Sequence, residues 1–184
     1  VRYERTYSLT QLDAQHVLLT VKKVDQGKVS TWLVEQAKVG DTLEFGAPYG
    51  DMQLPAQAQP LILLAAGSGI TPMYSLLQDM AKSGRLGSTP VTLMYWVKTF
   101  ADAAFKAQFE AWAQQYPNFK FQVFYTQEPS GAHSRLNAEH LKDLAQIEQS
   151  AVFACGPSGF TTQAEQLLAQ AALLKTEAFS MTPV

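Results

Sequence analysis

The chain has 184 residues, of which 47% are hydrophobic and 16% charged, with a formal net charge of −2 and a single cysteine. This composition is that of an ordinary globular protein with one large or two small domains, and it argues against nucleic acid or an anionic membrane surface as the main partner. No apolar run reaches the roughly 18–20 residues of a membrane span, and one cysteine excludes an internal disulfide or a cysteine-ligated iron–sulfur or zinc site within these residues.

The first part of the chain carries patterns typical of β-structure. Strands are predicted at 16–24 ("HVLLTVKKV") and 41–46 ("DTLEFG"), and a short helix between them at 27–36 ("GKVSTWLVEQ"). The stretch 54–60 ("LPAQAQP") has prolines near both ends and no periodicity, which is typical of a short connector.

After the connector, strands and helices alternate. Apolar and β-branched runs predict strands at 61–66, 91–97, 119–125, 151–154 and 175–181. Helical spacing occupies 72–81, 103–116, 138–147 and 158–172, with Asn137 placed to cap the third of these helices. Such alternation predicts a parallel sheet with right-handed crossovers, which binds ligands at the carboxyl ends of its strands.

A glycine loop follows the first of these strands. Gly67 and Gly69 permit a sharp turn, and Thr71-Pro72 indicates a helix start with proline at the first helical position. The amide-rich end of a helix favours anions, phosphate above all. An ordinary strand–turn–helix corner is the alternative, and the acidic residue of the usual G-x-G-x-x-G fingerprint is not evident. The place of the loop in an α/β sheet favours a nucleotide pyrophosphate.

Four stretches together resemble the ferredoxin–NADP reductase superfamily: "RTYS" (5–8), "GKVSTWL" (27–33) with "GAPYGDMQL" (46–54), "AAGSGITPM" (65–73) and "ACGPSGF" (154–160). Their order and spacing match that family from the middle of its flavin domain to the end of its nicotinamide domain. The fold class implied is α/β plus all-β. Residues 1–54 form the C-terminal part of a partial antiparallel flavin-binding β-barrel, 55–60 a linker, and 61–184 a five-stranded parallel doubly wound nicotinamide-binding domain.

On the flavin side, the resemblance implies that Arg5 pairs with a flavin phosphate and that Tyr7 lies against the isoalloxazine and ribityl chain. Ser8 hydrogen-bonds the redox-active nitrogen, and Thr6 belongs to the same stretch. A second clamp is formed at a helix start by Gly27, Lys28, Val29 and Ser30. The non-functional alternatives are a polar strand edge and plain N-capping by Ser30. Trp32 and Leu33 are assigned to the core.

On the nicotinamide side, the pyrophosphate is held by the loop and helix start, namely Gly67, Ser68, Gly69, Thr71 and Pro72, with the Thr71 hydroxyl directed toward the flavin or nicotinamide. Cys155 lies where the family places a cysteine beside the hydride-carrying carbon, and Gly156 and Pro157 turn the chain there. A buried cysteine that acts only as a small hydrophobe is the alternative. Glu177 and Phe179 match a terminal E-x-F stretch near the flavin.

The implied activity is hydride transfer from NADH or NADPH to FAD, and then electron transfer to a ferredoxin-type iron–sulfur domain or protein, or to haem, feeding an oxygenase or desaturase. FMN stays open beside FAD. The residues counted as catalytic are Ser8, Thr71, Cys155 and Glu177. Glu128 would repel a 2′-phosphate and favours NADH, whereas Lys98, also counted as coenzyme-binding, would attract one.

Two other functions are weighed against this reading. A non-catalytic electron-transfer or regulatory subunit would keep the fold and bind only one cofactor. A phosphate-binding hydrolase has little support, since the sequence carries no Gly-Lys-Ser/Thr run and no Ser–His–acid arrangement.

We expect the sequence to be a piece of a longer cytoplasmic protein. In the family about three barrel strands precede the R-x-Y-S stretch, whereas Arg5 is almost the first residue here. The last residues, "EAFSMTPV" (177–184), resemble a linker into a plant-type ferredoxin domain. A short protein completed by a second subunit is the alternative.

Overall fold

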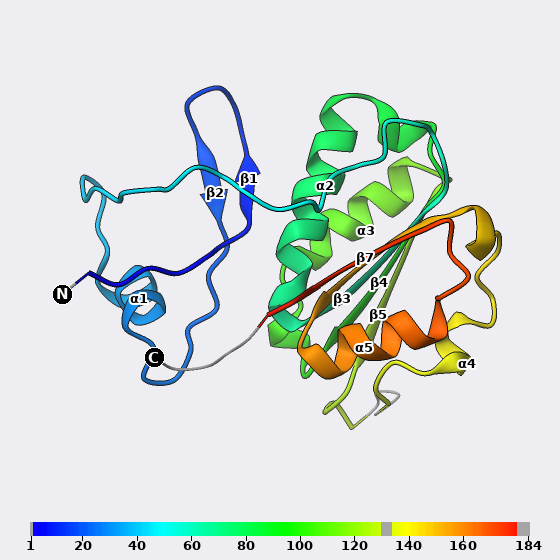
Figure 1. Ribbon diagram of the computed structural model, residues 1–184. Helices are drawn as coiled ribbons and strands as arrows, with labels where there is room; N and C mark the ends of the chain where they lie inside the picture. The colour runs from blue at the N-terminus through cyan, green and yellow to red at the C-terminus, as the bar shows by residue number, and fades with distance from the viewer. Residues whose placement is uncertain (1, 130–133, 180–184) are drawn as a thin grey trace.

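The computed structural model describes residues 2–129 and 134–179. The N-terminal part contains strands β1 (Leu9–Gln11) and β2 (Val17–Leu19) and helix α1 (Lys28–Thr31), which a wider π-turn continues to Gln36. The two strands pair antiparallel, with Leu9 opposite Leu19. Figure 1 shows this hairpin beside α2, while α1 lies farther from the rest of the molecule.

The prediction of a strand at 41–46 is wrong. Within the described chain, residues 37–60 contain neither helix nor strand, and the side chains of 41–50 are exposed. A strand needs a neighbour to bond its backbone groups, and Asp41 donates only to the nearby Lys38 carbonyl. For the same reason the strand predicted at 16–24 is limited to the three residues that β1 pairs.

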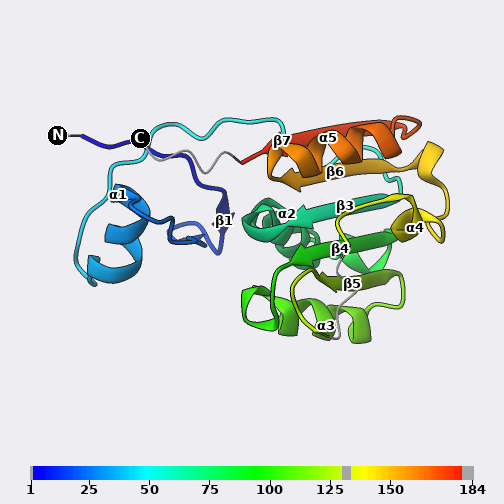
Figure 2. The same ribbon diagram turned by 90° about the horizontal axis from the view of Figure 1, so that it is seen from below.

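The C-terminal part is a five-stranded parallel sheet in the order β5-β4-β3-β6-β7. Its strands are β3 (Leu61–Ala66), β4 (Val91–Val97), β5 (Phe119–Tyr125), β6 (Ala151–Gly156) and β7 (Leu173–Ala178), and its helices are α2 (Ile70–Lys82), α3 (Lys106–Gln115), α4 (Ala138–Leu141) and α5 (Ser158–Leu167). Figure 2 shows the strand order with helices on both sides of the sheet. The predicted doubly wound fold is confirmed.

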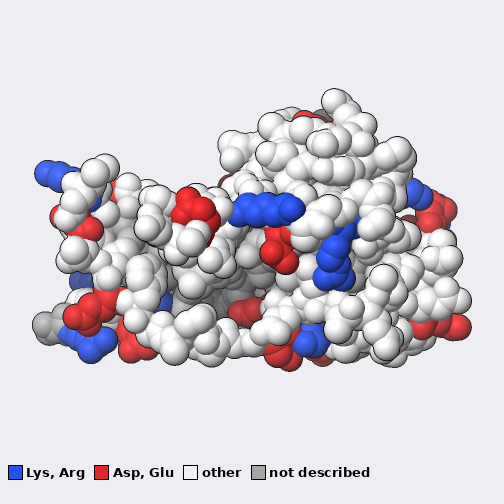
Figure 3. All heavy atoms as spheres, turned by 90° about the horizontal axis from the view of Figure 1, so that it is seen from above, with Lys and Arg blue, Asp and Glu red and all other residues white. Residues whose placement is uncertain are grey.

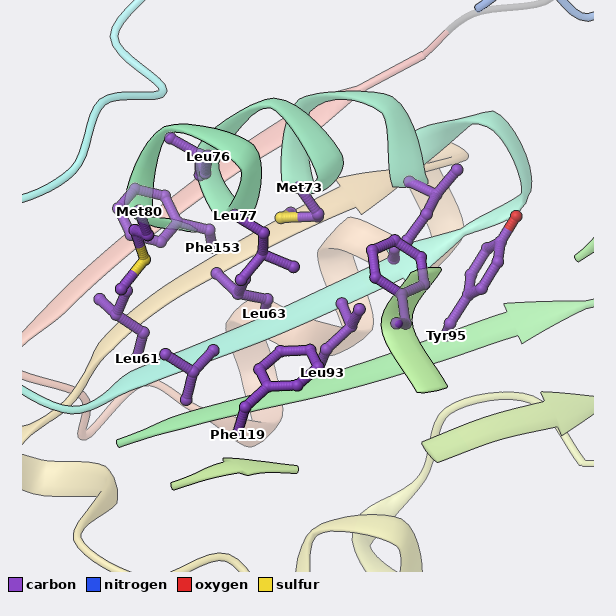
Figure 4. Close-up of a cluster of buried hydrophobic side chains, with 14 of the residues drawn as sticks. Leu61, Leu63, Met73, Leu76, Leu77, Met80, Leu93, Tyr95, Phe119 and Phe153 are labelled. Carbon is purple, nitrogen blue, oxygen red and sulfur yellow. The ribbon is translucent and has the colours of Figure 1, made fainter. Parts of the chain in front are cut away.

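Alternate residues of β3 supply the two cores. Leu61, Leu63 and Ala65 belong to the core on the side of α2 and α3, and the close-up in Figure 4 shows the two leucines beneath α2. Ile62 and Leu64 face the other layer, with α5 and α4. All five side chains are buried, as expected of a central parallel strand covered on both faces.

Several helix ends differ from the predictions. α2 begins at Ile70, so Pro72 is its third residue, where the missing N–H costs no bond because the first four helical amides have no intrahelical partner. α4 ends at Leu141 rather than near 147, although Asn137 caps it as predicted, accepting the Glu139 N–H at 3.0 Å. The fifth strand ends at Ala178; residues 180 and 181 of its predicted range lie outside the described residues. No described helix has the length and apolarity to cross a membrane.

The connector and the residues just before it are bonded to, and packed against, the C-terminal part. The Lys175 ammonium donates to the Asp51 carbonyl at 2.5 Å, and the Arg85 guanidinium donates to the Pro55 carbonyl at 3.2 Å. Between these two points, Met52 and Leu54 pack against the core on the α2 side of the sheet.

Candidate functional site

Three of the predicted stretches meet at the carboxyl ends of β3, β6 and β7. The register places Ala65 beside Cys155 and Gly156 beside Ala178. One residue farther, the Phe179 N–H donates to the Gly156 carbonyl at 2.9 Å. Parallel pairing therefore brings the glycine loop, the C-G-P turn and the 177–179 stretch to one edge of the sheet.

The glycine loop lies directly against the end of β6. A β-carbon on Gly69 would stand 2.1 Å from the Cys155 carbonyl oxygen, and Gly67 has a φ of +55°. No side chain caps the amino end of α2. The Ile70 N–H already donates to the Gly67 and Ser68 carbonyls, so an anion beside this tight contact would be bound by the other amides of the loop. The loop fits a pyrophosphate. The Thr71 hydroxyl donates to the Ser68 carbonyl at 3.0 Å, inside the loop.

Cys155 and Glu177 are neighbours across β6 and β7. The Cys155 side chain is fully buried in the core on the α2 side. Burial, together with the Glu177 charge, raises the pKa of this thiol, so it stays protonated at neutral pH. Partial burial, and then the charge of Asp51, raise the pKa of the Glu177 carboxyl.

The loops after β4 and β5 are bonded together. The Gln127 N–H donates to the Lys98 carbonyl at 2.9 Å, and the Glu128 carboxylate accepts the Phe100 N–H at 2.8 Å. The Lys98 side chain is exposed next to this link. The structure therefore holds both of the residues weighed for coenzyme choice at the same end of the sheet as the glycine loop.

In the N-terminal part, a cavity of about 600 Å³ opens at the amino end of α1. Its lining includes Gly27, Lys28 and Val29, three of the four residues predicted for the second flavin clamp. The fourth, Ser30, is buried and its hydroxyl accepts the Val24 N–H at 3.1 Å. Ser30 is thus the third residue of the helix and not its N-cap, which is Gly27.

Three apolar residues of this cavity were not predicted as site residues. Tyr3, Trp32 and Leu43 line it, although the sequence assigned Trp32 to the core. Helical spacing could have indicated Trp32 as a site residue, because it lies four residues after Lys28 on the same helix face. For Tyr3 the sequence carries no comparable signal, because the predicted stretch 5–8 is not among the residues that line this cavity. The rings and the free amides suit a flavin nucleotide.

The predicted flavin stretch, 5–8, is extended and leads into β1. Tyr7 is half-buried, and burial raises the pKa of its phenol, while the Arg5 charge lowers it. Arg5 and Thr6 are exposed, and the Arg5 guanidinium donates to the Glu4 carbonyl. Ser8 directly precedes the strand.

The charges of the surface form no single-sign patch on the face shown in Figure 3, where acidic and basic side chains alternate. Among the residues that the structure describes, no group of three or more His, Cys, Asp or Glu side chains could hold a metal ion.

Comparison with known proteins identifies the two parts. The model of the oxidoreductase NAD-binding domain matches residues 63–166, and that of the oxidoreductase FAD-binding domain matches residues 2–54. The NADPH oxidoreductase of Mycobacterium tuberculosis is 34% identical over 174 residues, which are 91% of this chain and 44% of that protein. The toluate 1,2-dioxygenase electron transfer component of Pseudomonas putida is 34% identical over 118 residues, 64% of this chain and 34% of that protein.

The chain thus spans less than half the length of these relatives. Among solved structures, the ferredoxin-NADP+ reductase of Plasmodium falciparum has a TM-score of 0.76 at 16% identity, with 95% of this chain and 77% of that chain covered. This likeness concerns the fold alone. Together, the matches confirm the resemblance predicted from the four sequence stretches.

Proposed function

Because the chain belongs to the oxidoreductases with an FAD-binding and an NAD-binding domain, we propose that it is the catalytic part of an NAD(P)H-dependent flavoprotein reductase. The observation that carries the proposal is the pair of sites in one chain. An uncapped helix start tightly packed against β6 suits a pyrophosphate, and an aromatic-lined cavity at α1 suits a flavin.

The residues divide by cofactor. The loop Gly67–Gly69 and the amides that begin α2 would hold the coenzyme pyrophosphate. Arg5, Tyr7 and the residues at the start of α1 would hold FAD. When bound, the cofactors supply the hydride transfer from nicotinamide to flavin, so the protein needs no acid–base pair of its own.

The protein's contribution is to bind, orient and exclude water. Ser8 would donate its hydroxyl to the flavin ring, and Thr71 would stand between the two rings. Phe179 would lie beside the nicotinamide, and Cys155, whose neutral thiol is fully buried, would pack behind that space. Glu177, the partner of Cys155 in β7, would place its carboxyl group at the same carboxyl end of the sheet.

The electron acceptor is proposed from a relative. The Pseudomonas putida protein is named as an electron transfer component of a dioxygenase. We propose a ferredoxin-type iron–sulfur domain or protein as the acceptor in an oxygenase or desaturase system, and a cytoplasmic location, where NADH and NADPH are supplied.

Anaerobic titration tests the activity. The protein is loaded with FAD, NADH is added in the absence of oxygen, and the visible flavin absorption is followed. Bleaching at a rate well above that of free FAD with NADH supports a reductase. Tight binding of only one of the two cofactors, with no bleaching by NADH or NADPH, would overturn it in favour of a single-cofactor subunit.

A further inference from the structure

Helix α2 contacts the N-terminal part through a half-buried hydrogen bond in its second turn. The Ser75 hydroxyl donates to the Leu9 carbonyl at 2.9 Å, across 66 residues of sequence. Leu9 follows Ser8, which the proposed function places at the flavin. Ser75 lies one helical turn after Thr71, which the proposed function places between the rings.

A second contact fixes the direction of β1 along the helix. The Lys82 ammonium donates to the Gln11 carbonyl at 2.8 Å and to the Leu12 carbonyl at 2.6 Å. Ser75 and Lys82 are seven residues apart and therefore share one face of α2. The helix therefore contacts the strand and the residue after it at two points along one face.

The opposite face of α2 belongs to the core. Met73, Leu77 and Met80 are fully buried against β3 and its neighbours, and Figure 4 shows them pointing from the helix to the sheet. The glycine loop at the amino end of α2 is held against β6 by the Gly69 contact. Helix α2 therefore connects the glycine loop at its amino end to β1, the strand that follows the predicted flavin stretch.

We propose that Ser75 is a positioning residue that sets the distance between nicotinamide and flavin, through Leu9 and without touching either cofactor. The inference rests on the proposed function. Hydride transfer requires the reacting atoms at near-contact distance, and a misplacement of about 1 Å can lower a rate roughly 100-fold. A hydrogen bond one residue from Ser8 is well placed to control that distance.

The test compares three variants of the full chain loaded with FAD. Ser75→Ala removes the contact, and Ser75→Thr keeps a hydroxyl. Ser83→Ala is the control, because Ser83 is the exposed C-cap residue of α2 and its hydroxyl donates to the Met80 carbonyl of the same helix. The limiting rate of flavin reduction by saturating NADH is measured in single turnover, along with FAD affinity, NADH affinity and the unfolding midpoint.

We expect Ser75→Ala to lower the limiting rate about tenfold, with both affinities and the unfolding midpoint close to those of the parent protein. Ser75→Thr should recover most of the rate, and Ser83→Ala should keep it. If Ser75→Ala reduces its flavin at the parent rate, or if its rate falls only in step with FAD affinity or stability, the inference fails. If the parent protein is not reduced at all, the proposed function fails instead.

Discussion

The carbonyl oxygen of Cys155 faces the α-carbon of Gly69 so closely that a β-carbon there would stand 2.1 Å from it and 2.4 Å from the carbonyl carbon. This contact joins the loop after β3 to the end of β6. It involves backbone on the Cys155 side, which cannot be relieved by a rotamer change. The contact therefore fixes where the amino end of α2 lies relative to the sheet.

Gly69→Ala should consequently lower the free energy of unfolding by at least about 2 kcal/mol and weaken coenzyme binding, because overpacking against backbone forces the loop to move. Gly159→Ala is the control, since a β-carbon there meets nothing within 4 Å and alanine is the better helix former. Urea unfolding and NADH titration of both variants check this. Equal stability of the two variants would contradict the contact.

Cys155→Ala should lower the free energy of unfolding by about 1–2 kcal/mol, the cost of a modest core truncation, and slow flavin reduction by NADH. The side chain is fully buried and neutral, so its proposed role is to shape the space beside the nicotinamide. Stopped-flow reduction and urea unfolding separate the two effects. A stability loss with an unchanged reduction rate would leave Cys155 as a core residue only.

Glu128→Gln should raise the ratio of kcat/KM for NADPH to that for NADH roughly two- to fivefold, the effect of up to about 1 kcal/mol of screened charge repulsion. Glutamine keeps an oxygen to accept the Phe100 N–H, so only the charge changes. We expect the parent protein to prefer NADH. A clear preference for NADPH would refute this and assign the 2′-phosphate to Lys98, and Lys98→Ala should then abolish it.

The pKa of Glu177 is raised above its ordinary value of 4.5, first by burial and then by Asp51. The protonated carboxyl therefore contributes stability that is fully present below pH 4.5 and is lost as the pH rises through the raised pKa. Urea unfolding is measured from pH 4.5 upward through the raised pKa. Over this range the free energy of unfolding of the parent protein should fall relative to that of Glu177→Gln, whose side chain stays neutral. Asp51→Asn should reduce the loss. Parallel pH profiles for parent and Glu177→Gln would show that the carboxyl titrates normally.

The central strands could be predicted from the sequence to the residue. Those at 61–66 and 91–97 are apolar runs buried on both faces, so hydrophobicity alone marks their ends. The segment 41–46 has the alternating pattern of a half-buried strand, yet it forms no strand. A strand also needs a neighbouring strand to pair with, and the local sequence does not show whether one is present. Helix α4 ends at Leu141 and not near 147 for a related reason. Tertiary packing, and not the spacing of apolar residues alone, decides how long a short helix is.

The meeting of the glycine loop, the C-G-P turn and the 177–179 stretch was also predictable, because parallel strands bring their carboxyl ends together in any register. Its details were not. The sequence gives no sign that the Thr71 hydroxyl bonds Ser68 or that Ser30 bonds Val24. The sequence assigned Trp32 to the core, because an aromatic ring that lines a cavity and one that is buried in a core have the same sequence pattern.

The fixed connector changes where the molecule can be divided. The sequence places the boundary at 55–60, but Asp51, Met52, Leu54 and Pro55 are all attached to the C-terminal part. A coenzyme-binding fragment that starts at residue 61 would uncover the apolar surface under Met52 and Leu54. A fragment that starts at residue 50 would keep Met52 and Leu54 packed over that surface. The unit to be expressed is therefore longer than the strand pattern implies.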